Sequence, residues 1–477
     1  MRITSKKQKI VIIGAGPAGL GAAFELTKDK QAELDLLIID KNSQVGGLAR
    51  SFKFKGHFFD VGPHRFYTKN KEVFDLWKNT LKKDFYEVPR LTRILYKNKL
   101  FFYPIKLTDV IKKLGILESV RCLVSFVKTK IEPKKTAKTF EDWVSQNFGK
   151  KLYTIFFKTY TEKVWGIDCG KIGAEWAAQR IKNLSFSEVI KNALGGKNKA
   201  KSLIDKFYYP KRGAGSMYEK LASKIKQGKG KFFLDSAVSK IYHRQKKVVS
   251  LDFKKEISVQ ILPVDYLFSS MPLTEFILKL SPSAPAKVVA AAKKLYYRDH
   301  ITVNLLVQGT NLFPDNWIYI HSPEVQMARV TNYNNFRKNP SQDKTSAIAV
   351  EYFVFQDDQL WSLSDEELVA LAIKELEQVA LINKDLKIEG FVIRETESYP
   401  TYYLGHKQYF DILKNYVEQL SNLSLIGRGG MYKYNNMDHS LYSGMLAARN
   451  FLLGYKKYDI WQINEDAEYL EEEKPSI

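Results

Sequence analysis

The clearest pattern of apolar and polar positions lies in the first 40 residues. A short apolar run ending in a turn, KIVIIGAG at 9–16, is followed by LGAAFEL at 20–26, which is rich in alanine and leucine. A second apolar run, LDLLIID, occupies residues 34–40. Short apolar runs bounded by turn residues predict buried strands, and the alanine-rich segment predicts a helix. The order of strand, turn, helix and strand indicates a Rossmann-like α/β unit.

The spacing of apolar residues changes further along the chain. Within residues 105–203 the apolar positions recur about every 3.6 residues, which predicts a helical cap or substrate domain. Strands then return, with KFFLDSAVSKIYH at 231–243 predicted as a single strand. A last strand, glycine turn and helix, the helix starting near Asn436, precede an acidic tail. We therefore expect an α/β fold with these parts: a Rossmann-like part at 1–104, the cap at 105–203, a return to the Rossmann-like domain at 204–285, a mixed α+β substrate-domain sheet at 286–400, a C-terminal strand and helix of the Rossmann-like domain at 401–463, and the tail at 464–477.

Composition narrows the class of protein. The chain has 477 residues, of which 45% are hydrophobic, enough for two or three domain cores. Its two cysteines, Cys122 and Cys169, lie far apart, which argues against a disulfide scaffold and against a metal site. The sequence contains no run of 18 apolar residues, so no membrane-spanning helix is expected. The first apolar run is too short for a signal peptide. We expect a cytoplasmic protein without a metal.

The net charge of +23 favours general solubility and gives some bias toward anionic partners. Nucleic acid is disfavoured, because the lysines are spread along the chain and no nucleic-acid-binding motif accompanies them. An anionic small substrate and an anionic membrane surface stay open. The segment 109–135 mixes apolar residues with lysines. It would suit either a helix pair packed in the cap or a peripheral contact with a membrane surface.

A glycine motif at the first turn points to a dinucleotide. Gly14, Gly16 and Gly19 form GxGxxG between the predicted strand and helix, the context that gives this motif its meaning. One glycine makes the turn, the next lets the backbone approach a pyrophosphate, and the third lets the helix pack on the strand. Asp40, at the end of the second strand, is placed to accept hydrogen bonds from a ribose.

A second glycine turn follows, formed by Gly46 and Gly47 and continued by Leu48. An NAD site does not require this turn. The spacing from Gly14 through Asp40 to Gly46 resembles two-dinucleotide-binding flavoenzymes, a superfamily that includes amine oxidases and protoporphyrinogen oxidases. The resemblance implies FAD as the cofactor.

Three further stretches resemble segments of UDP-galactopyranose mutases. They are VGPHRFYT at 61–68, FFKTYTEKVWG at 156–166 and GRGGMYKYNNMD at 427–438. The chain also resembles protoporphyrinogen-oxidase-like proteins of surface-polysaccharide pathways. Val164 and Asn436 depart from the mutase pattern, as does the extra glycine in GRGG.

The resemblance implies roles for particular residues. It places Gly62 and His64 against the flavin ring and Val238 near the adenine, and it assigns Gly427, Arg428, Asn436 and Met437 to the cofactor. Residues that would line the pocket of a nucleotide-sugar or lipid-diphosphate-sugar substrate are Tyr160, Trp165, Arg180, Arg329 and Tyr434. Of these, Arg180 and Arg329 would clamp the diphosphate, with Arg329 in a loop that closes over the substrate. His64, Trp165, Arg180, Arg329 and Tyr434 are the catalytic candidates.

Three functions stay open. In the mutases the reduced flavin acts as a nucleophile toward the sugar, which requires no Ser-His-Asp or paired-carboxylate set. An oxidase or dehydrogenase of an amine, porphyrinogen or polyene would keep the glycine motifs but would not need two paired arginines. The third is a flavin-binding protein without catalysis.

Overall fold

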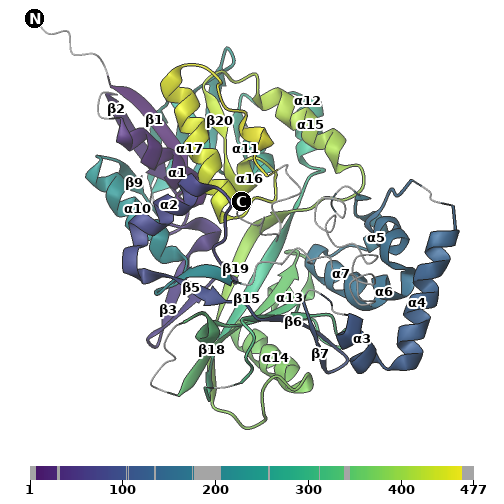
Figure 1. The fold of residues 1–477 in the computed structure, drawn as a ribbon. Coiled ribbons are helices and arrows are strands. Elements are labelled where there is room, and N and C mark those ends of the chain that lie inside the picture. Colours follow the sequence, from purple (N-terminus) through teal and green to yellow (C-terminus); the bar gives the residue numbers. More distant parts are fainter. Residues whose placement is uncertain are drawn as a thin grey trace, which may run out of the picture.

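A five-stranded parallel sheet forms the centre of one half of the molecule (Figure 1). The computed structural model describes residues 7–29, 33–103, 105, 107–133, 136–174, 176, 206–255, 258–310, 312–337 and 344–464. The sheet order is β20 (Leu423–Leu425), β13 (Tyr266–Ser269), β1 (Gln8–Ile13), β2 (Leu34–Ile39) and β9 (Lys231–Phe233). Ile10 and Ile12 of β1 pack in one core, whereas Val11 and Ile13 pack in another. A sheet buried on both faces needs apolar residues throughout, which explains the uninterrupted apolar run.

Two different layers cover this sheet. One face carries the helices α1 (Pro17–Lys28), α2 (Lys71–Leu81), α10 (Gly215–Gln227) and α17 (Met437–Leu453). The other carries an antiparallel layer of β12 (Ser258–Pro263), β11 (Lys247–Lys255) and β10 (Ser236–Arg244), extended by β14 (Leu280–Ser281), with α11 (Leu273–Leu278), α12 (Ala286–Ala292) and α15 (His406–Val417). The single strand predicted at 231–243 is therefore wrong. It divides into β9 and β10, because Asp235 has a left-handed φ of 51° and turns the chain from one sheet to the other.

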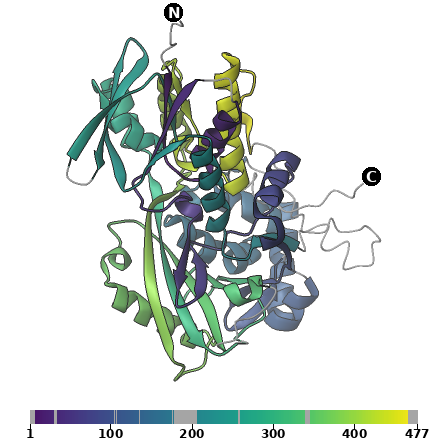
Figure 2. The same ribbon diagram turned by 90° about the vertical axis from the view of Figure 1, so that its left-hand side faces the viewer.

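A seven-stranded mixed sheet forms the other half of the molecule (Figure 2). Its order is β19 (Ile388–Pro400), β15 (Tyr297–Gln308), β18 (Thr345–Val354), β17 (Arg329–Asn332), β16 (Trp317–Ile320), β6 (Thr92–Tyr96) and β7 (Lys99–Phe102). Helix α14 (Asp365–Gln378) packs on it through the buried residues Leu368, Ala372 and Leu376. Two short antiparallel pairs belong to neither of these sheets. They are β3 (Ser51–Phe54) with β4 (His57–Asp60), and β5 (Phe85–Pro89) with β8 (Lys206–Pro210).

A group of helices covers the end of the mixed sheet at β6 and β7. It consists of α3 (Leu107–Leu114), α4 (Ile116–Ile131), α5 (Phe140–Phe148), α6 (Lys150–Tyr153) and α7 (Thr159–Trp165). These helices share a core with Ile94 and Phe101 of the sheet. None of the helices in the described ranges is both long enough and apolar enough to cross a membrane. The α/β class and the helical cap agree with the fold class predicted from the sequence.

Candidate active site

A cavity of about 220 Å³ opens where β1 and β2 end. Turns from several parts of the chain meet there. Its lining includes Gly14, Gly16, Asp40, Gly47, Leu48, Val238, Gly427, Asn436 and Met437. Val238 lies near the start of β10 and Gly427 follows β20, so N-terminal, middle and C-terminal segments of the chain build one groove.

Some glycines of this region leave room for a pyrophosphate, and others serve packing. Gly16 precedes α1 with an extended backbone, and the atom nearest to a Cβ added there would be the Cα of Gly47, at 3.5 Å. Gly19 lies outside the lining and serves packing, because a Cβ there would stand 1.8 Å from the Gly14 carbonyl oxygen. The carboxylate of Asp40 holds the turn by accepting from the Ala15 N–H at 2.6 Å. These residues fit a dinucleotide whose pyrophosphate lies against the glycines and the N-terminus of α1.

A second cavity, of about 250 Å³, adjoins the first. Both cavities are lined by Leu48, His64, Arg428, Asn436 and Met437, so they meet at these residues. The turn after β4 supplies His64, whose backbone N–H donates to the backbone carbonyl of Gly62 at 2.7 Å. Burial and the nearby Arg428 lower the pKa of His64 to about 3, and its Nδ1 has no partner within the described chain. His64 is therefore a neutral imidazole at the junction of the two cavities.

Arg428 lies at the same junction. Its guanidinium donates to the backbone carbonyls of Asn435 (3.0 Å) and Ser398 (3.1 Å). It also lies 4.8 Å and 5.0 Å from the ring centroids of Tyr399 and Tyr434. No carboxylate of the described residues forms an ion pair with it. Its charge is thus held by carbonyl dipoles and aromatic rings and is available to an anion in the cavity.

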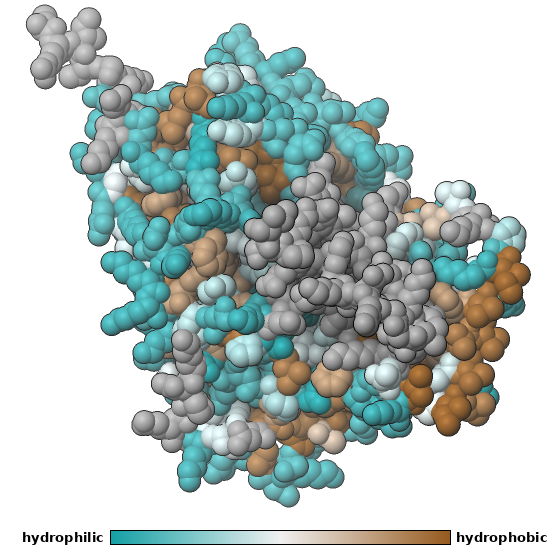
Figure 3. Space-filling view, viewed as in Figure 1, coloured by the Kyte–Doolittle hydropathy of each residue, from teal (hydrophilic) through white to brown (hydrophobic). Residues whose placement is uncertain are grey.

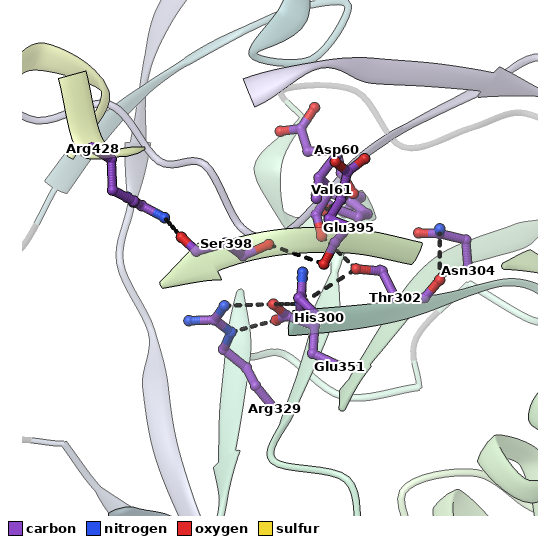
Figure 4. A network of polar contacts seen from close by, with 11 residues as sticks. Asp60, Val61, His300, Thr302, Asn304, Arg329, Glu351, Glu395, Ser398 and Arg428 are labelled. Carbon is purple, nitrogen blue, oxygen red and sulfur yellow. Dashed lines mark hydrogen bonds and ion pairs between the residues drawn. The ribbon is translucent and has the colours of Figure 1, made fainter. Parts of the chain in front are cut away.

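Arg329 is held in a different way. It begins strand β17 and forms a bidentate ion pair with Glu351 of β18, rather than lying in a loop (Figure 4). Glu351 also contacts His300 Nε2 at 3.0 Å. Burial alone would raise the pKa of Glu351, but Arg329 and His300 hold it at about 2. The pair engages Nε and Nη2 of Arg329 and leaves Nη1 outside it.

Asp438 adds a titratable group to the second cavity. It lies in the first turn of α17, is almost completely buried, and has its pKa raised to about 7 by that burial. The N-terminus of α17 faces the junction, since Asn436 and Met437 line both cavities. A helix N-terminus stabilises negative charge near it.

The family follows from a comparison with known proteins. A family model described as flavin containing amine oxidoreductase matches residues 17–452. The chain belongs to this family. Its cofactor is FAD, for which the glycine-lined groove is suited.

The chain of this flavoenzyme is similar to several individual proteins. A solved structure of reduced UDP-galactopyranose mutase aligns with a TM-score of 0.83 at 22% identity, covering 97% of this chain and 98% of that one. A probable UDP-galactopyranose mutase of Klebsiella pneumoniae is 29% identical over 35% of this chain and 43% of its own length. The chain thus spans less than half of that relative. A coproporphyrinogen III oxidase of Staphylococcus aureus (strain NCTC 8325 / PS 47) is 21% identical over 86% of this chain and 92% of its own.

The other residues predicted for the substrate pocket of the flavoenzyme are distributed unevenly. Tyr434 lines the second cavity and stacks on Tyr399, with ring centroids 5.4 Å apart. Tyr160 lies one layer behind, stacked on His321 and in edge contact with Tyr319 of the lining. Trp165 is buried in the cap core, 6.5 Å from the ring of Tyr434. Arg180 lies outside the described residues.

Sequence reasoning missed several lining residues. Arg65 stood inside the VGPHRFYT stretch and could have been read from it. Tyr319, Tyr399 and His300 belong to strands of the mixed sheet, and no local motif marks them. Asp438 ends the GRGGMYKYNNMD stretch, but only its burial gives it a distinctive pKa.

Proposed function

We propose that the protein is an FAD-dependent enzyme that acts on a nucleotide- or lipid-linked diphosphate sugar by mutase-type chemistry in surface-polysaccharide biosynthesis. The proposal is supported by three sequence segments similar to UDP-galactopyranose mutases and by the fold shared with one of them. Two adjoining cavities give the arrangement that such a reaction needs, with a groove for FAD beside a chamber for the sugar.

The observation that carries the proposal is the environment of Arg428. A guanidinium at the cavity junction, balanced by carbonyl oxygens and two tyrosine rings, favours an anionic ligand. Arg65 and Arg329 line the same cavity. Glu351 neutralises Arg329, and Asp438 interacts electrostatically with Arg65, whereas Arg428 forms no ion pair with a carboxylate of the described residues, so its charge favours an anionic ligand. A cationic amine would be repelled from such a chamber.

The described residues suggest how the substrate is held. Arg428 and Nη1 of Arg329 would bind the diphosphate oxygens, while Tyr399 and Tyr434 flank them. The uncharged His64 would pack against the flavin edge without competing for the anion. When bound, FAD supplies an electron-rich or electron-accepting ring according to its redox state.

A second function is favoured by the same arginines. Coproporphyrinogen is rich in carboxylates, which arginine binds as well as it binds phosphates. The chain is similar to a coproporphyrinogen III oxidase over most of its length. Oxidase chemistry on a substrate bearing carboxylates is therefore the alternative.

Two measurements separate these functions. The purified FAD-loaded protein should be incubated, oxidised or dithionite-reduced, with a panel of nucleotide diphosphate sugars, and ring-size isomers should be resolved chromatographically. A mutase produces isomers only after reduction and without stoichiometric use of reductant. An oxidase starts from oxidised flavin and consumes one two-electron acceptor for each pair of electrons removed, which is three acceptors for each coproporphyrinogen III converted to the porphyrin. Acceptor-dependent turnover of the porphyrinogen, with no sugar bound, would replace the first function by the second.

Binding provides a separate test of the anion site. Arg428→Gln should weaken nucleotide diphosphate binding by roughly 10- to 150-fold, since hydrogen bonds to charged groups contribute about 1.5–3 kcal/mol. Arg428→Lys should lose less, because it keeps the charge. Arg394→Gln is the matched control, since Arg394 pairs with Asp365 outside both cavities. Equal affinities for all the variants, measured by calorimetry, would contradict the assignment.

A further inference from the structure

Helix α4 exposes a continuous apolar face. Its Cys122 packs in the cap core and its Phe126 is also buried, so the helix is anchored on one side. On the opposite side, seven apolar residues are between 46% and 79% exposed. This outer face of α4 consists of Ile116, Leu117, Val120, Leu123, Val124, Val127 and Ile131. In Figure 3 the apolar residues gather at the edge of the molecule where Figure 1 places α4.

The spacing of these residues forms one stripe. At 3.6 residues per turn, the seven positions fall within an arc of about 120° on the helix surface. On the neighbouring elements, Ile111 of α3 and Phe102 of β7 are also 41% and 39% exposed. Isolated exposed apolar residues are ordinary, but a continuous stripe of this kind marks an interaction surface.

Basic residues border the stripe on both sides. By the same helical geometry, Lys130 lies along one edge, and Arg121 and Lys128 lie along the other. Glu118 falls on the side away from the stripe and is paired with Arg121 and Lys151, and Glu132, just after the helix, lies 3.8 Å from Lys128. Long basic side chains can extend past an apolar surface to reach anionic groups above it.

We propose that the outer face of α4 binds the surface of an anionic lipid membrane, with the helix lying parallel to the bilayer plane. An apolar stripe with basic borders is the arrangement by which helices enter the boundary between headgroups and acyl chains. A second copy of the chain fits less well. Its own Arg121, Lys128 and Lys130 would face those of the first, and each molecule carries a net charge of +23. The inference does not depend on the proposed function.

Vesicle co-sedimentation tests the proposal with the full-length, FAD-loaded protein. Wild-type protein should sediment with vesicles of equal parts phosphatidylglycerol and phosphatidylcholine and should not sediment with phosphatidylcholine alone. Val120→Asn/Val124→Asn should lower the partition coefficient by at least about tenfold, because burying even one valine side chain favours the bound state by about a factor of ten. The matched control is Val259→Asn/Ile261→Asn. These two side chains are similarly exposed but belong to β12, outside the cap. It should bind as wild type does.

A second pair of variants keeps the test independent of the apolar substitutions. Lys128→Gln/Lys130→Gln should weaken binding roughly fivefold per lysine, and added salt should weaken wild-type binding. Bound flavin absorbance and circular dichroism verify that each variant is folded. The proposal is overturned if wild-type protein ignores anionic vesicles or if the α4 variants sediment like wild type. It is also overturned if light scattering finds a wild-type dimer that the α4 variants convert to a monomer without any lipid binding.

Discussion

At the scale of single residues, Asp438 determines how ligand binding responds to pH. Its pKa is raised to about 7 by burial, and it lines the cavity where we place the anion. As the pH rises through 7 its carboxyl loses a proton and adds negative charge beside that site. Affinity for a nucleotide diphosphate should therefore fall by roughly tenfold, since a unit charge several ångströms away costs on the order of 1–2 kcal/mol at an effective dielectric constant near 20.

Calorimetric titration from pH 6 to pH 8.5 measures this effect. With a nucleotide diphosphate sugar as the ligand, whose phosphates do not titrate in this range, Asp438→Asn should give a flat profile. Asp60 offers the matched control, because burial also raises its pKa to about 7 but its contacts are Ser51, Tyr209 and Ala214, outside the cavity. Asp60→Asn should keep the wild-type profile. A profile that is unchanged in Asp438→Asn would remove this residue from the anion site.

Arg329 contributes to stability as well as to the cavity. Arg329→Ala would leave Glu351, which is completely buried, without its cationic partner. Removing one member of a buried pair costs about 3–5 kcal/mol. We expect the urea midpoint to fall accordingly. Arg329→Ala/Glu351→Gln should recover most of the loss, because a neutral glutamine can still accept a hydrogen bond from His300. If the double variant is no more stable than the single one, the loss has another source.

At the scale of elements, helices α1 and α17 set the shape of the cofactor groove. They cross in close contact, and a Cβ at Gly444 would stand 1.9 Å from the Ala18 carbonyl oxygen. Gly444→Ala should push the helices apart and lower the free energy of unfolding by about 1–3 kcal/mol, although alanine normally favours a helix. Gly16→Ala adds the same methyl group where nothing lies closer than 3.5 Å.

These two variants should behave differently in urea unfolding of the FAD-free protein. Gly444→Ala should lower the midpoint, whereas Gly16→Ala should unfold as wild type does and lose FAD affinity instead. The prediction is wrong if both variants unfold at the wild-type midpoint without FAD.

The same elements show how far the sequence could be interpreted. The N-terminal part of the groove was predictable, because Gly14, Gly16 and Asp40 follow short apolar strands within the first 40 residues. The partners of Arg329 were not, because Glu351 and His300 lie 22 and 29 residues away on separate strands, and only their pairing order in the sheet brings them together. Asp235 turns the chain with a backbone conformation that its residue type does not require. Trp165 belongs to a motif, but its burial depends on the packing of the cap.

At the scale of the whole molecule, the cofactor groove joins parts of the chain that are far apart in sequence. Its lining comes from the first strand and turn, from the start of β10, from the end of β19 and from the turn before α17. A ligand that contacts all of these segments connects the parallel sheet to the mixed sheet. FAD should therefore stabilise the folded molecule as a whole and not a single loop.

Removing FAD tests this expectation. With free FAD at 100 times its Kd, binding contributes about 2.7 kcal/mol, which raises the Tm by roughly 3 °C when all 477 residues unfold as one cooperative unit. Differential scanning calorimetry of protein stripped of FAD, with and without added cofactor, measures this shift. Gly16→Leu is the control, because its side chain would fill the groove from a backbone conformation that any residue adopts. Its Tm should match that of the stripped wild type and should not respond to FAD. If FAD raises the Tm of Gly16→Leu as much as that of wild type, the cofactor binds elsewhere.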